Sequence, residues 1–204
     1  FLHPKRASPF RSPAISPLDN TARAVTGVRE GGSQAMRFDV VRVPAEQSLG
    51  DYLNSGWMEG VDKASVEELA RHCMEAIAPD FANTVQAGDV VVAGRNFGMG
   101  SSREQAAQAL NILGVSAVVA KSFGGIFLRN ALNLGLPVMV CPATDEIRQD
   151  DRVAVDLVGG RVINETTAVT LPGEPLPGFL LEMLADGGLV PHLEKRLAAK
   201  RGAS

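Results

Sequence analysis

Cysteine is scarce in this chain of 204 residues, which contains only Cys73 and Cys141. The two lie far apart and form no C-x-x-C pair, so unaided they cannot hold a zinc ion or an iron–sulfur cluster. Such sparse cysteine is compatible with a reducing compartment. We expect Cys73 to pack on the apolar face of a helix and Cys141 to pack at the end of a strand.

A large net charge and a long apolar run are also absent. The formal net charge of -3 gives no general electrostatic reason to bind nucleic acid or an anionic membrane. No apolar run approaches the roughly 18 residues of a membrane span. The chain is 45% hydrophobic and 21% charged, which is ordinary for a globular protein of one domain. We therefore expect neither nucleic acid nor a membrane as a partner.

The first 36 residues differ in composition from the rest. They are rich in proline and serine and lack apolar periodicity, which is typical of disorder. They carry five Lys or Arg against two acidic residues, and they lack the apolar stretch of a signal peptide. We expect residues 1–36 to be disordered, as a tag remnant, a processed end or a targeting segment, and residues 37–204 to form one domain.

The middle of the chain alternates between strand and helix patterns. Strands are predicted over residues 37–44, 89–94, 116–122 and 136–142. Helices are predicted over 65–77, where Ser65 and Glu68 form a capping box, and over 101–113 and 124–135. In the second helix Ala106, Leu110 and Leu113 should face inward. Because the strands are apolar throughout, we expect β-α-β units with a parallel sheet covered on both faces.

The pattern changes after Pro142. Residues 152–164 read as a hairpin around Gly159 and Gly160, and residues 177–200 as a helix, a Gly-Gly stop and a last amphipathic helix. His72 is expected at the rim of a helix face and His192 near the surface. A single histidine without a partner specifies no chemistry, so we assign both to structure.

The stretch "GRNFGMGSSREQAAQAL", residues 94–110, follows a strand and opens a helix. Open α/β sheets place ligand sites at such a point, and free amides at a helix start attract anions. The glycines do not give G-x-G-x-x-G and there is no P-loop lysine, which disfavours a nucleotide. On spacing alone, Ser101 and Ser102 either cap the helix or contact a ligand.

The presence of Arg103 favours ligand binding over simple helix capping at this turn. A cation in the first helical turn is opposed by the helix dipole, and a carboxylate shared with the serine hydroxyls and free amides would reverse that balance, although Glu104 offsets part of it. For a serine to act as a base, its hydroxyl pKa would have to be lowered further. A helix terminus contributes at most about 2 kcal/mol, roughly 1.5 pKa units, so Arg103, a metal-bound substrate or a partner subunit would have to assist. There is no Ser-His-Asp arrangement and no nucleophile elbow.

Two long motifs resemble one family. "GRNFGMGSSREQA" is similar to the family pattern G-x-N-F-G-x-G-S-S-R-E-H-A, and "AKSFGGIFLRNALNLGLPV", residues 120–138, to A-K-S-F-x-x-I-F-x-R-N-A-x-N-x-G-L-P. The chain thus resembles the swivelling domain of the aconitase superfamily, and within it the small subunits of 3-isopropylmalate dehydratase. The likeness covers roughly two-thirds of the chain. It implies an α/β fold, a swivelling three-layer β/β/α domain with a mostly parallel sheet.

The resemblance also implies an activity. The family's hydro-lyase isomerises 2-isopropylmalate and 3-isopropylmalate by dehydration and rehydration, in cytoplasmic leucine biosynthesis. Ser101 would be the base for the carbon-bound proton, while Ser102 and Arg103, with Gly100 and Asn96, would hold a carboxylate of the di- or tricarboxylate substrate. The 4Fe-4S cluster, which binds the leaving hydroxyl, would sit in a partner large subunit, so this chain would bind no cofactor.

Two departures from the family pattern leave alternatives open. Gln105 replaces the usual histidine, and the family's early D-x-x-T-D-x-I-x-P segment has no counterpart between Phe38 and Glu67. The chain would then be a paralogous small subunit for another malate-like or homoaconitate-type acid, or a non-catalytic swivel domain. Lys121 either faces the site or is a solvated strand end, and Arg129 lies at the site or at a subunit interface. With Gln105 they are our candidates for residues that support the site from behind the substrate-binding groups.

Overall fold

The computed structural model describes residues 36–42, 66–75, 78–99 and 104–202. The strands in this part are β1 (Met36–Arg42), β2 (Val90–Ala93), β3 (Ala117–Ala120), β4 (Val138–Val140), β5 (Arg152–Asp156), β6 (Arg161–Asn164) and β7 (Val169–Pro172). The helices are α2 (Val66–Arg71), α3 (Phe81–Thr84), α4 (Gln105–Ile112), α5 (Gly125–Asn133), α6 (Gly178–Ala185) and α7 (Leu189–Gly202), with a 3-10 turn, η2, at Thr144–Glu146.

The strands form a seven-stranded sheet in the order β4-β3-β2-β1-β5-β6-β7. The pairs β1–β2, β2–β3 and β3–β4 are parallel, and α4 and α5 connect β2 to β3 and β3 to β4. This confirms the predicted α/β class and its β-α-β units. The sheet also has an antiparallel half, since β5 pairs with β1, β6 with β5 and β7 with β6.

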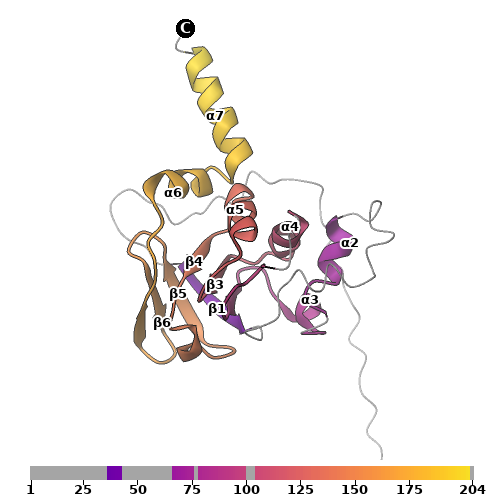
Figure 1. The fold of residues 1–204 in the computed structure, drawn as a ribbon, viewed down its shortest axis with the longest axis vertical. Helices are drawn as coiled ribbons and strands as arrows, with labels where there is room; N and C mark the ends of the chain where they lie inside the picture. Colours follow the sequence, from indigo (N-terminus) through magenta and orange to yellow (C-terminus); the bar gives the residue numbers. More distant parts are fainter. Residues whose placement is uncertain (1–35, 43–65, 76–77, 100–103, 203–204) are drawn as a thin grey trace, which may run out of the picture.

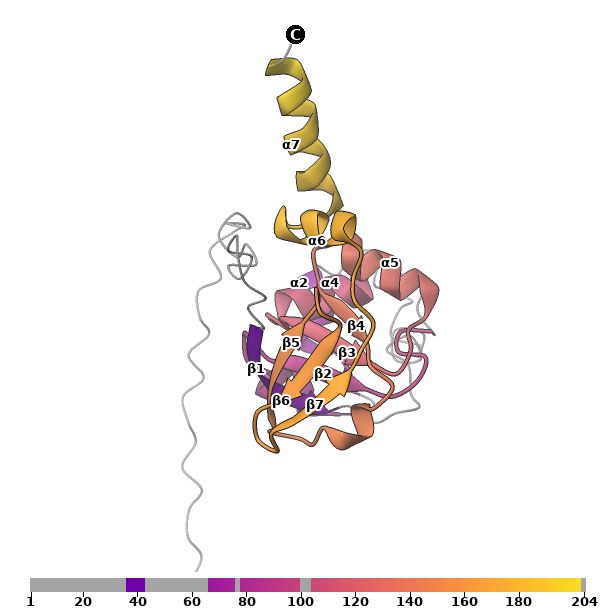
Figure 2. The ribbon, with the colours of Figure 1, turned by 90° about the vertical axis from the view of Figure 1, so that its left-hand side faces the viewer.

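The antiparallel half folds back over the parallel half. Just after β7, the amide of Glu174 donates to the carbonyl of Val140 in β4, at 2.8 Å, so the two outer strands of the sheet come together. A Cβ on Gly173 would lie 2.8 Å from the sulfur of Met139. The orange strands β6 and β7 accordingly lie in front of the parallel strands in Figure 2. The two halves of the sheet form two layers, and the helices form the third.

The core lies between these layers. Every residue of β2 and β3 is buried, as the uniformly apolar strands predict for a sheet covered on both faces. From the helix layer, α4 contributes Ala106 and Leu110, and Leu113 packs against the same core. The predicted inward face of this helix is confirmed.

Some boundaries differ from the sequence prediction. Helix α2 ends at Arg71 rather than at residue 77, and a turn follows in which Met74 has a φ of 58°. A left-handed residue cannot continue a helix, although Met74 is fully buried and fits the helical pattern. The short elements α3 and β7 were not predicted. Ser65, the proposed cap of α2, lies outside the described residues.

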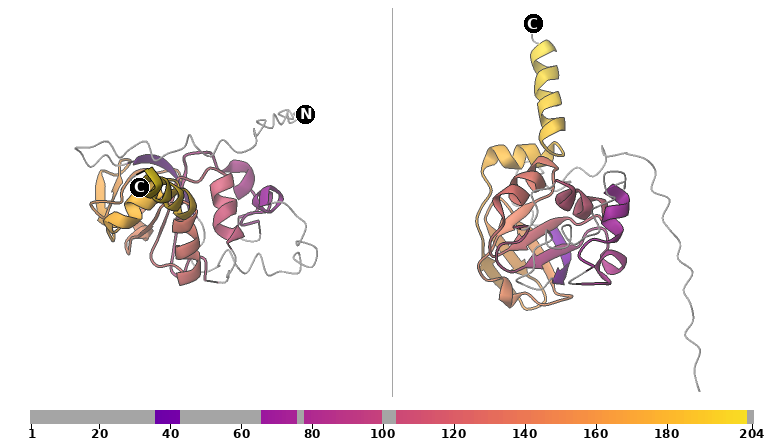
Figure 3. Two further views of the ribbon diagram at one scale, coloured as in Figure 1. Left: turned by 90° about the horizontal axis from the view of Figure 1, so that it is seen from above. Right: turned by 45° about the vertical axis from the view of Figure 1, so that its right-hand side comes forward.

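The chain ends on a helix that leaves the body. In Figures 1 and 3, α7 extends away from the sheet, and none of its residues is buried. It carries the predicted Gly-Gly stop before it, at Gly187 and Gly188. Within the ranges that the structure describes, no helix is long and apolar enough to cross a membrane.

Candidate functional site

The two sequence motifs meet at the carboxyl ends of β2 and β3. Ala93 and Ala120 are paired in the parallel register, so Gly94 and Lys121 emerge at the same sheet edge. The amide of Lys121 donates to the carbonyl of Gly94 at 3.0 Å. Ligand sites of open α/β sheets lie at this edge, and the fold places both motifs there.

The two motif segments continue side by side beyond their strands. Phe97 and Phe123 form a parallel bridge. The amide of Phe97 donates to the carbonyl of Ser122 at 3.0 Å, and the amide of Gly124 donates to the carbonyl of Phe97 at 2.8 Å. Residues 94–99 and 121–124 therefore form one unit, which we call the motif loop pair.

Asn96 shapes the first of these loops. It has a φ of 57°, a left-handed conformation that asparagine tolerates better than most residues. Its amide donates to the hydroxyl oxygen of Ser122 at 2.8 Å, and that hydroxyl can donate in turn to the Asn96 side-chain oxygen, at 3.3 Å. Its carbonyl accepts from the amide of Met99. A carboxylate-binding role for Asn96 stays a prediction, but its contacts to Ser122 position the loop.

Three phenylalanines pack together at the loop pair, with Phe97 and Phe123 from its two segments and Phe127 from α5. The rings of Phe97 and Phe127 meet edge to face, with centroids 5.1 Å apart, and Phe123 and Phe127 are stacked at 6.2 Å. Gly98, with a φ of +78°, lies so close that a Cβ there would be 2.3 Å from the Phe127 ring. A Cβ on Gly124 would be 2.7 Å from the Cα of Met99. Both glycines are needed because the backbone passes directly over its neighbours.

The proposed catalytic residues fall between described segments. Gly100, Ser101, Ser102 and Arg103 lie outside the described part of the chain, so their predicted roles and the start of the helix at Ser101 stay predictions. Their neighbours are well placed. Met99 on one side, and Glu104 and Gln105 on the other, are all exposed. The chain on both sides of this tetrapeptide is therefore at the protein surface.

The three residues expected to support the site, Gln105, Lys121 and Arg129, occupy different positions. The Lys121 ammonium donates to the carboxylate of Asp145 in η2, so this lysine is an ion-paired strand end and not merely a solvated one. Gln105 is exposed at the first residue of α4. Arg129 is exposed at the middle of α5. Of these three residues, only Lys121 belongs to the motif loop pair.

Ser122 and Asp145 were missed by the sequence analysis. Ser122 stands in the quoted second motif, at the position where a parallel strand ends opposite the first motif, and that register was the available signal. Nothing in the sequence around Asp145 indicates that it lies near the motif loops. It belongs to a short 3-10 turn after β4, and only the folded chain brings it to Lys121.

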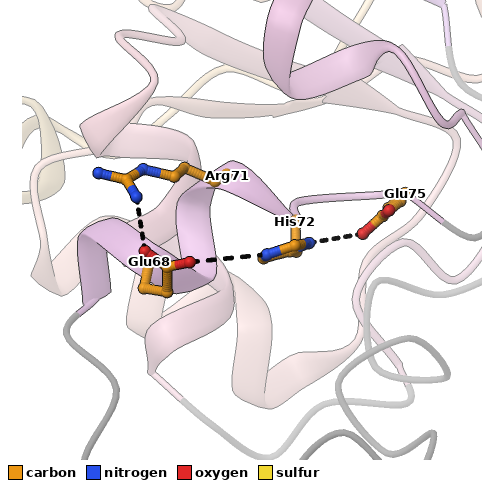
Figure 4. Close-up of polar contacts among 4 residues, drawn as sticks. All are labelled: Glu68, Arg71, His72 and Glu75. Carbon is orange, nitrogen blue, oxygen red and sulfur yellow. Dashed lines mark hydrogen bonds and ion pairs between the residues drawn. The ribbon is translucent and has the colours of Figure 1, made fainter.

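His72 has partners, contrary to the assumption that it has none. Its Nδ1 lies 2.6 Å from a carboxylate oxygen of Glu75, and its Nε2 lies 3.8 Å from Glu68, which also accepts from Arg71 (Figure 4). All four residues belong to α2 and the turn after it. The predicted position at the rim of that helix is confirmed, because the imidazole is about one quarter exposed, at 28%.

Neither cysteine is placed for chemistry. Cys73 and Cys141 are both free and buried. Burial raises the pKa of the Cys73 thiol to about 12. It also raises the pKa of Cys141, against a smaller opposite effect of the Ala143 backbone hydrogen bond. The packing roles predicted for both are confirmed, and two thiols in separate elements do not fit an iron–sulfur cluster held by this chain, because such a cluster takes four cysteine ligands.

The comparisons with known proteins identify the family. Residues 52–142 match the family model of the aconitase C-terminal domain. The chain is 51% identical to 3-isopropylmalate dehydratase small subunit 1 of Thermotoga maritima over 131 residues, which are 64% of this chain and 79% of that protein. It is 50% identical to small subunit 2 of Archaeoglobus fulgidus over 133 residues, which are 65% of this chain and 80% of that protein.

A solved structure supports the same family assignment. The fold matches a crystal structure of 3-isopropylmalate dehydratase from Methanocaldococcus jannaschii with a TM-score of 0.72 and 37% identity. The match covers 83% of this chain and 99% of that one. The sequence identity to these relatives and the matching fold lead to one conclusion. The chain belongs to the family of 3-isopropylmalate dehydratase small subunits, within the aconitase superfamily.

Proposed function

We propose that the chain is the small subunit of a hydro-lyase that interconverts 2-isopropylmalate and 3-isopropylmalate by dehydration and rehydration, in leucine biosynthesis. The observation that carries this proposal is the motif loop pair. Asn96 and Ser122, which are 26 residues apart, join two segments at the carboxyl edge of the parallel strands, and the first segment is followed by G-S-S-R. The relatives named above carry the activity in their names.

In this proposal Ser101 takes the proton from the substrate carbon. An alcohol is a weak acid, and the start of a helix lowers its pKa by only roughly 1.5 units. Arg103 adds a permanent positive charge two residues away, which favours the alkoxide further. Ser101 then returns a proton to the neighbouring carbon when water adds back, so the serine ends the cycle as it began.

Ser102, Arg103, Gly100 and Asn96 are assigned to the substrate carboxylate. A guanidinium donates two parallel hydrogen bonds to a carboxylate, and hydroxyl and amide donors fill the remaining lone pairs. Such a set binds one end of the acid and leaves its reacting carbons beside Ser101. Fixing the substrate in this way supplies catalysis by orientation as well as by charge.

We assign supporting roles to the three outer residues. Lys121, held by Asp145, ties the end of β3 to the turn after β4 and so fixes the base of the loop pair. Gln105, the first residue of α4, stands where the family pattern has histidine. Because a glutamine amide does not titrate, this position takes no part in a proton relay. Arg129, exposed on α5, is assigned to the interface with the large subunit.

The chain supplies only half of the proposed site. We place the 4Fe-4S cluster in a large subunit, where it would supply Lewis-acid assistance to the departure of the hydroxyl. The base and the carboxylate-binding groups belong to this chain. We therefore propose that the chain alone is inactive and that the assembled enzyme works in the cytoplasm, a reducing compartment in which its two free thiols persist.

Reconstitution tests the proposal. The chain is mixed anaerobically with the cluster-loaded large subunit, and the unsaturated intermediate is followed by absorbance with 2-isopropylmalate, 3-isopropylmalate, homoaconitate and methylmalate-type acids. Turnover confined to the isopropylmalates supports the proposal. Turnover on another acid would make the chain a paralogue of different specificity. A stable complex with an intact cluster that turns over no acid would leave a non-catalytic swivel domain.

A further inference from the structure

Met99 exposes an apolar side chain directly beside the proposed catalytic residues. It is 66% exposed, although methionine is among the residue types that are most often buried. It stands before the G-S-S-R sequence, at a position that the family pattern G-x-N-F-G-x-G-S-S-R leaves open. Among the described residues of the two motifs, Met99 and Ile126, at 44%, are the exposed large apolar side chains. Each motif therefore presents one apolar side chain at the surface.

The backbone of Met99 is held by both motifs, although its side chain is exposed. Its amide donates to the carbonyl of Asn96 at 3.0 Å, which closes the turn that contains Gly98. At the start of α5, the backbone of Gly124 lies so close that a Cβ there would be 2.7 Å from the Cα of Met99 and 2.9 Å from its nitrogen. The loop pair therefore fixes the point from which the Met99 side chain projects.

The covalent chain keeps Met99 near the proposed base. Met99 and Ser101 are two residues apart, and two residues of extended chain span at most about 7 Å. A methionine side chain is unbranched and has three rotatable bonds, so it adapts to the shape of a neighbouring group. A carbon that Ser101 deprotonates is therefore close enough for the Met99 side chain to contact what is bonded to that carbon.

The two isopropylmalates need an apolar contact at exactly this place. Both acids carry the isopropyl group on one of the two carbons between which the hydroxyl and the proton are exchanged. The side chains assigned so far, those of Asn96, Ser101, Ser102 and Arg103, are polar and suit the carboxylate and the proton. Binding an isopropyl group is favourable only where its apolar surface is removed from water. Met99 is the large apolar residue nearest to Ser101 in the sequence.

We propose that the Met99 side chain packs against the isopropyl group of the substrate, which makes Met99 a specificity-determining residue for the size and polarity of that substituent. The inference rests on the proposed function, because that function supplies an acid with this group. Dehydration turns the carbon that bears the isopropyl group from tetrahedral to planar, and the flexible thioether follows the group. Ser102 and Arg103 bind the carboxylate that all malate-type acids share, whereas Met99 contacts the substituent in which they differ.

Competitive inhibitors measure this contact. In the enzyme assembled with the cluster-loaded large subunit, isopropylsuccinate and methylsuccinate are each titrated against 2-isopropylmalate. The ratio of their inhibition constants reports what the two additional methyl groups contribute to binding. We expect Met99→Ala and Met99→Gln to reduce the preference for isopropylsuccinate about tenfold, because alanine is too short and glutamine is polar. Met99→Leu keeps an apolar side chain of similar volume and should retain the preference within about twofold.

The kinetics of the substrate should change in the same way. For Met99→Ala we expect KM for 2-isopropylmalate to rise more than kcat falls, since the contact is made in the bound substrate as well as in the transition state. Val158→Ala is the matched control. Val158 is also well exposed, at 61%, but it lies in the β5–β6 turn, outside both motifs. This variant should change neither the inhibitor preference nor KM.

The outcomes separate this inference from the proposed function. If the unmodified enzyme turns over 2-isopropylmalate but shows no preference for isopropylsuccinate, or if Met99→Ala keeps that preference, only this inference fails. Met99 variants that weaken the affinity for the large subunit, measured by titration calorimetry, and leave the inhibitor preference unchanged would place Met99 in the subunit interface and contradict the inference. If the unmodified complex turns over no isopropylmalate, the proposed function fails and the inference fails with it.

Discussion

The backbone amide of Asn96 donates a hydrogen bond of 2.8 Å to the hydroxyl oxygen of Ser122, across 26 residues of sequence. This contact joins the loop after β2 to the loop after β3. It holds the segment that leads into the proposed catalytic serines. Ser122, from the second motif, therefore holds the backbone of the first motif in place. This hydrogen bond makes the loop pair a single unit.

Removing that hydroxyl should impair the site more than the fold. Ser122→Ala deletes one acceptor for the Asn96 amide, which costs about 0.5–1.5 kcal/mol of stability. Because the loop then holds the catalytic segment less well, we expect kcat/KM in the assembled enzyme to fall about tenfold. Ser116→Ala, before the other end of β3, is the control and should leave both quantities unchanged. Equal kcat/KM values for the two variants would show that Ser122 does not position the catalytic segment.

The close approach of Gly98 to Phe127 predicts a measurable clash. Gly98→Ala introduces both a left-handed alanine and a Cβ 2.3 Å from the ring. Gly88→Ala introduces only the first, since Gly88 has a φ of +111° and nothing lies within 4 Å of its Cβ position. Overpacking costs about 1–3 kcal/mol, so Gly98→Ala should lose that much more unfolding free energy than Gly88→Ala. Equal losses in urea titrations would show that the contact is not tight.

Sequence patterns predicted the parallel half of the fold and the two motif loops at its edge, because the signals for both are local. Uniform valines mark β2 and β3, and the glycines and serines of the motifs mark the loops after them. Other features depend on distant contacts. The left-handed Met74 that follows α2 fits the helical pattern, and Asp145 meets Lys121 only through the pairing of β3 with β4. The last helix was predicted as amphipathic, but α7 buries none of its residues, because its apolar and charged side chains are not separated onto opposite faces.

The two thiols should be inert in the native chain. Cys73 and Cys141 are buried, and burial raises the pKa of both, that of Cys73 to about 12. Since the thiolate is the reactive form, a disulfide reagent at about pH 8 should label neither cysteine in the folded protein and both in denaturant. Rapid labelling of the native chain at Cys141 would show that the end of β4 opens readily.

Acid should weaken the root of α7. The hydrogen bonds from Lys195 and His192 hold the pKa of Asp186 below its ordinary value of 3.8. A lowered folded-state pKa means that this stabilisation is present above 3.8 and is lost as the pH falls through the lower, folded-state value. Urea unfolding at several pH values down to about 2.5 should show a smaller loss for Asp186→Asn, which has no carboxylate there to protonate. Identical pH profiles for the two proteins would contradict the assignment.

The central claim is that this chain contributes the base at Ser101 to a shared active site. The most direct measurement is turnover of 2-isopropylmalate by Ser101→Ala assembled with the cluster-loaded large subunit, alongside the affinity of the subunits and the melting temperature of the chain. We expect a loss of at least about 10³-fold in kcat, with affinity and melting temperature unchanged. Retained turnover, or a loss of stability that matches the loss of activity, would return Ser101 to a helix-capping role.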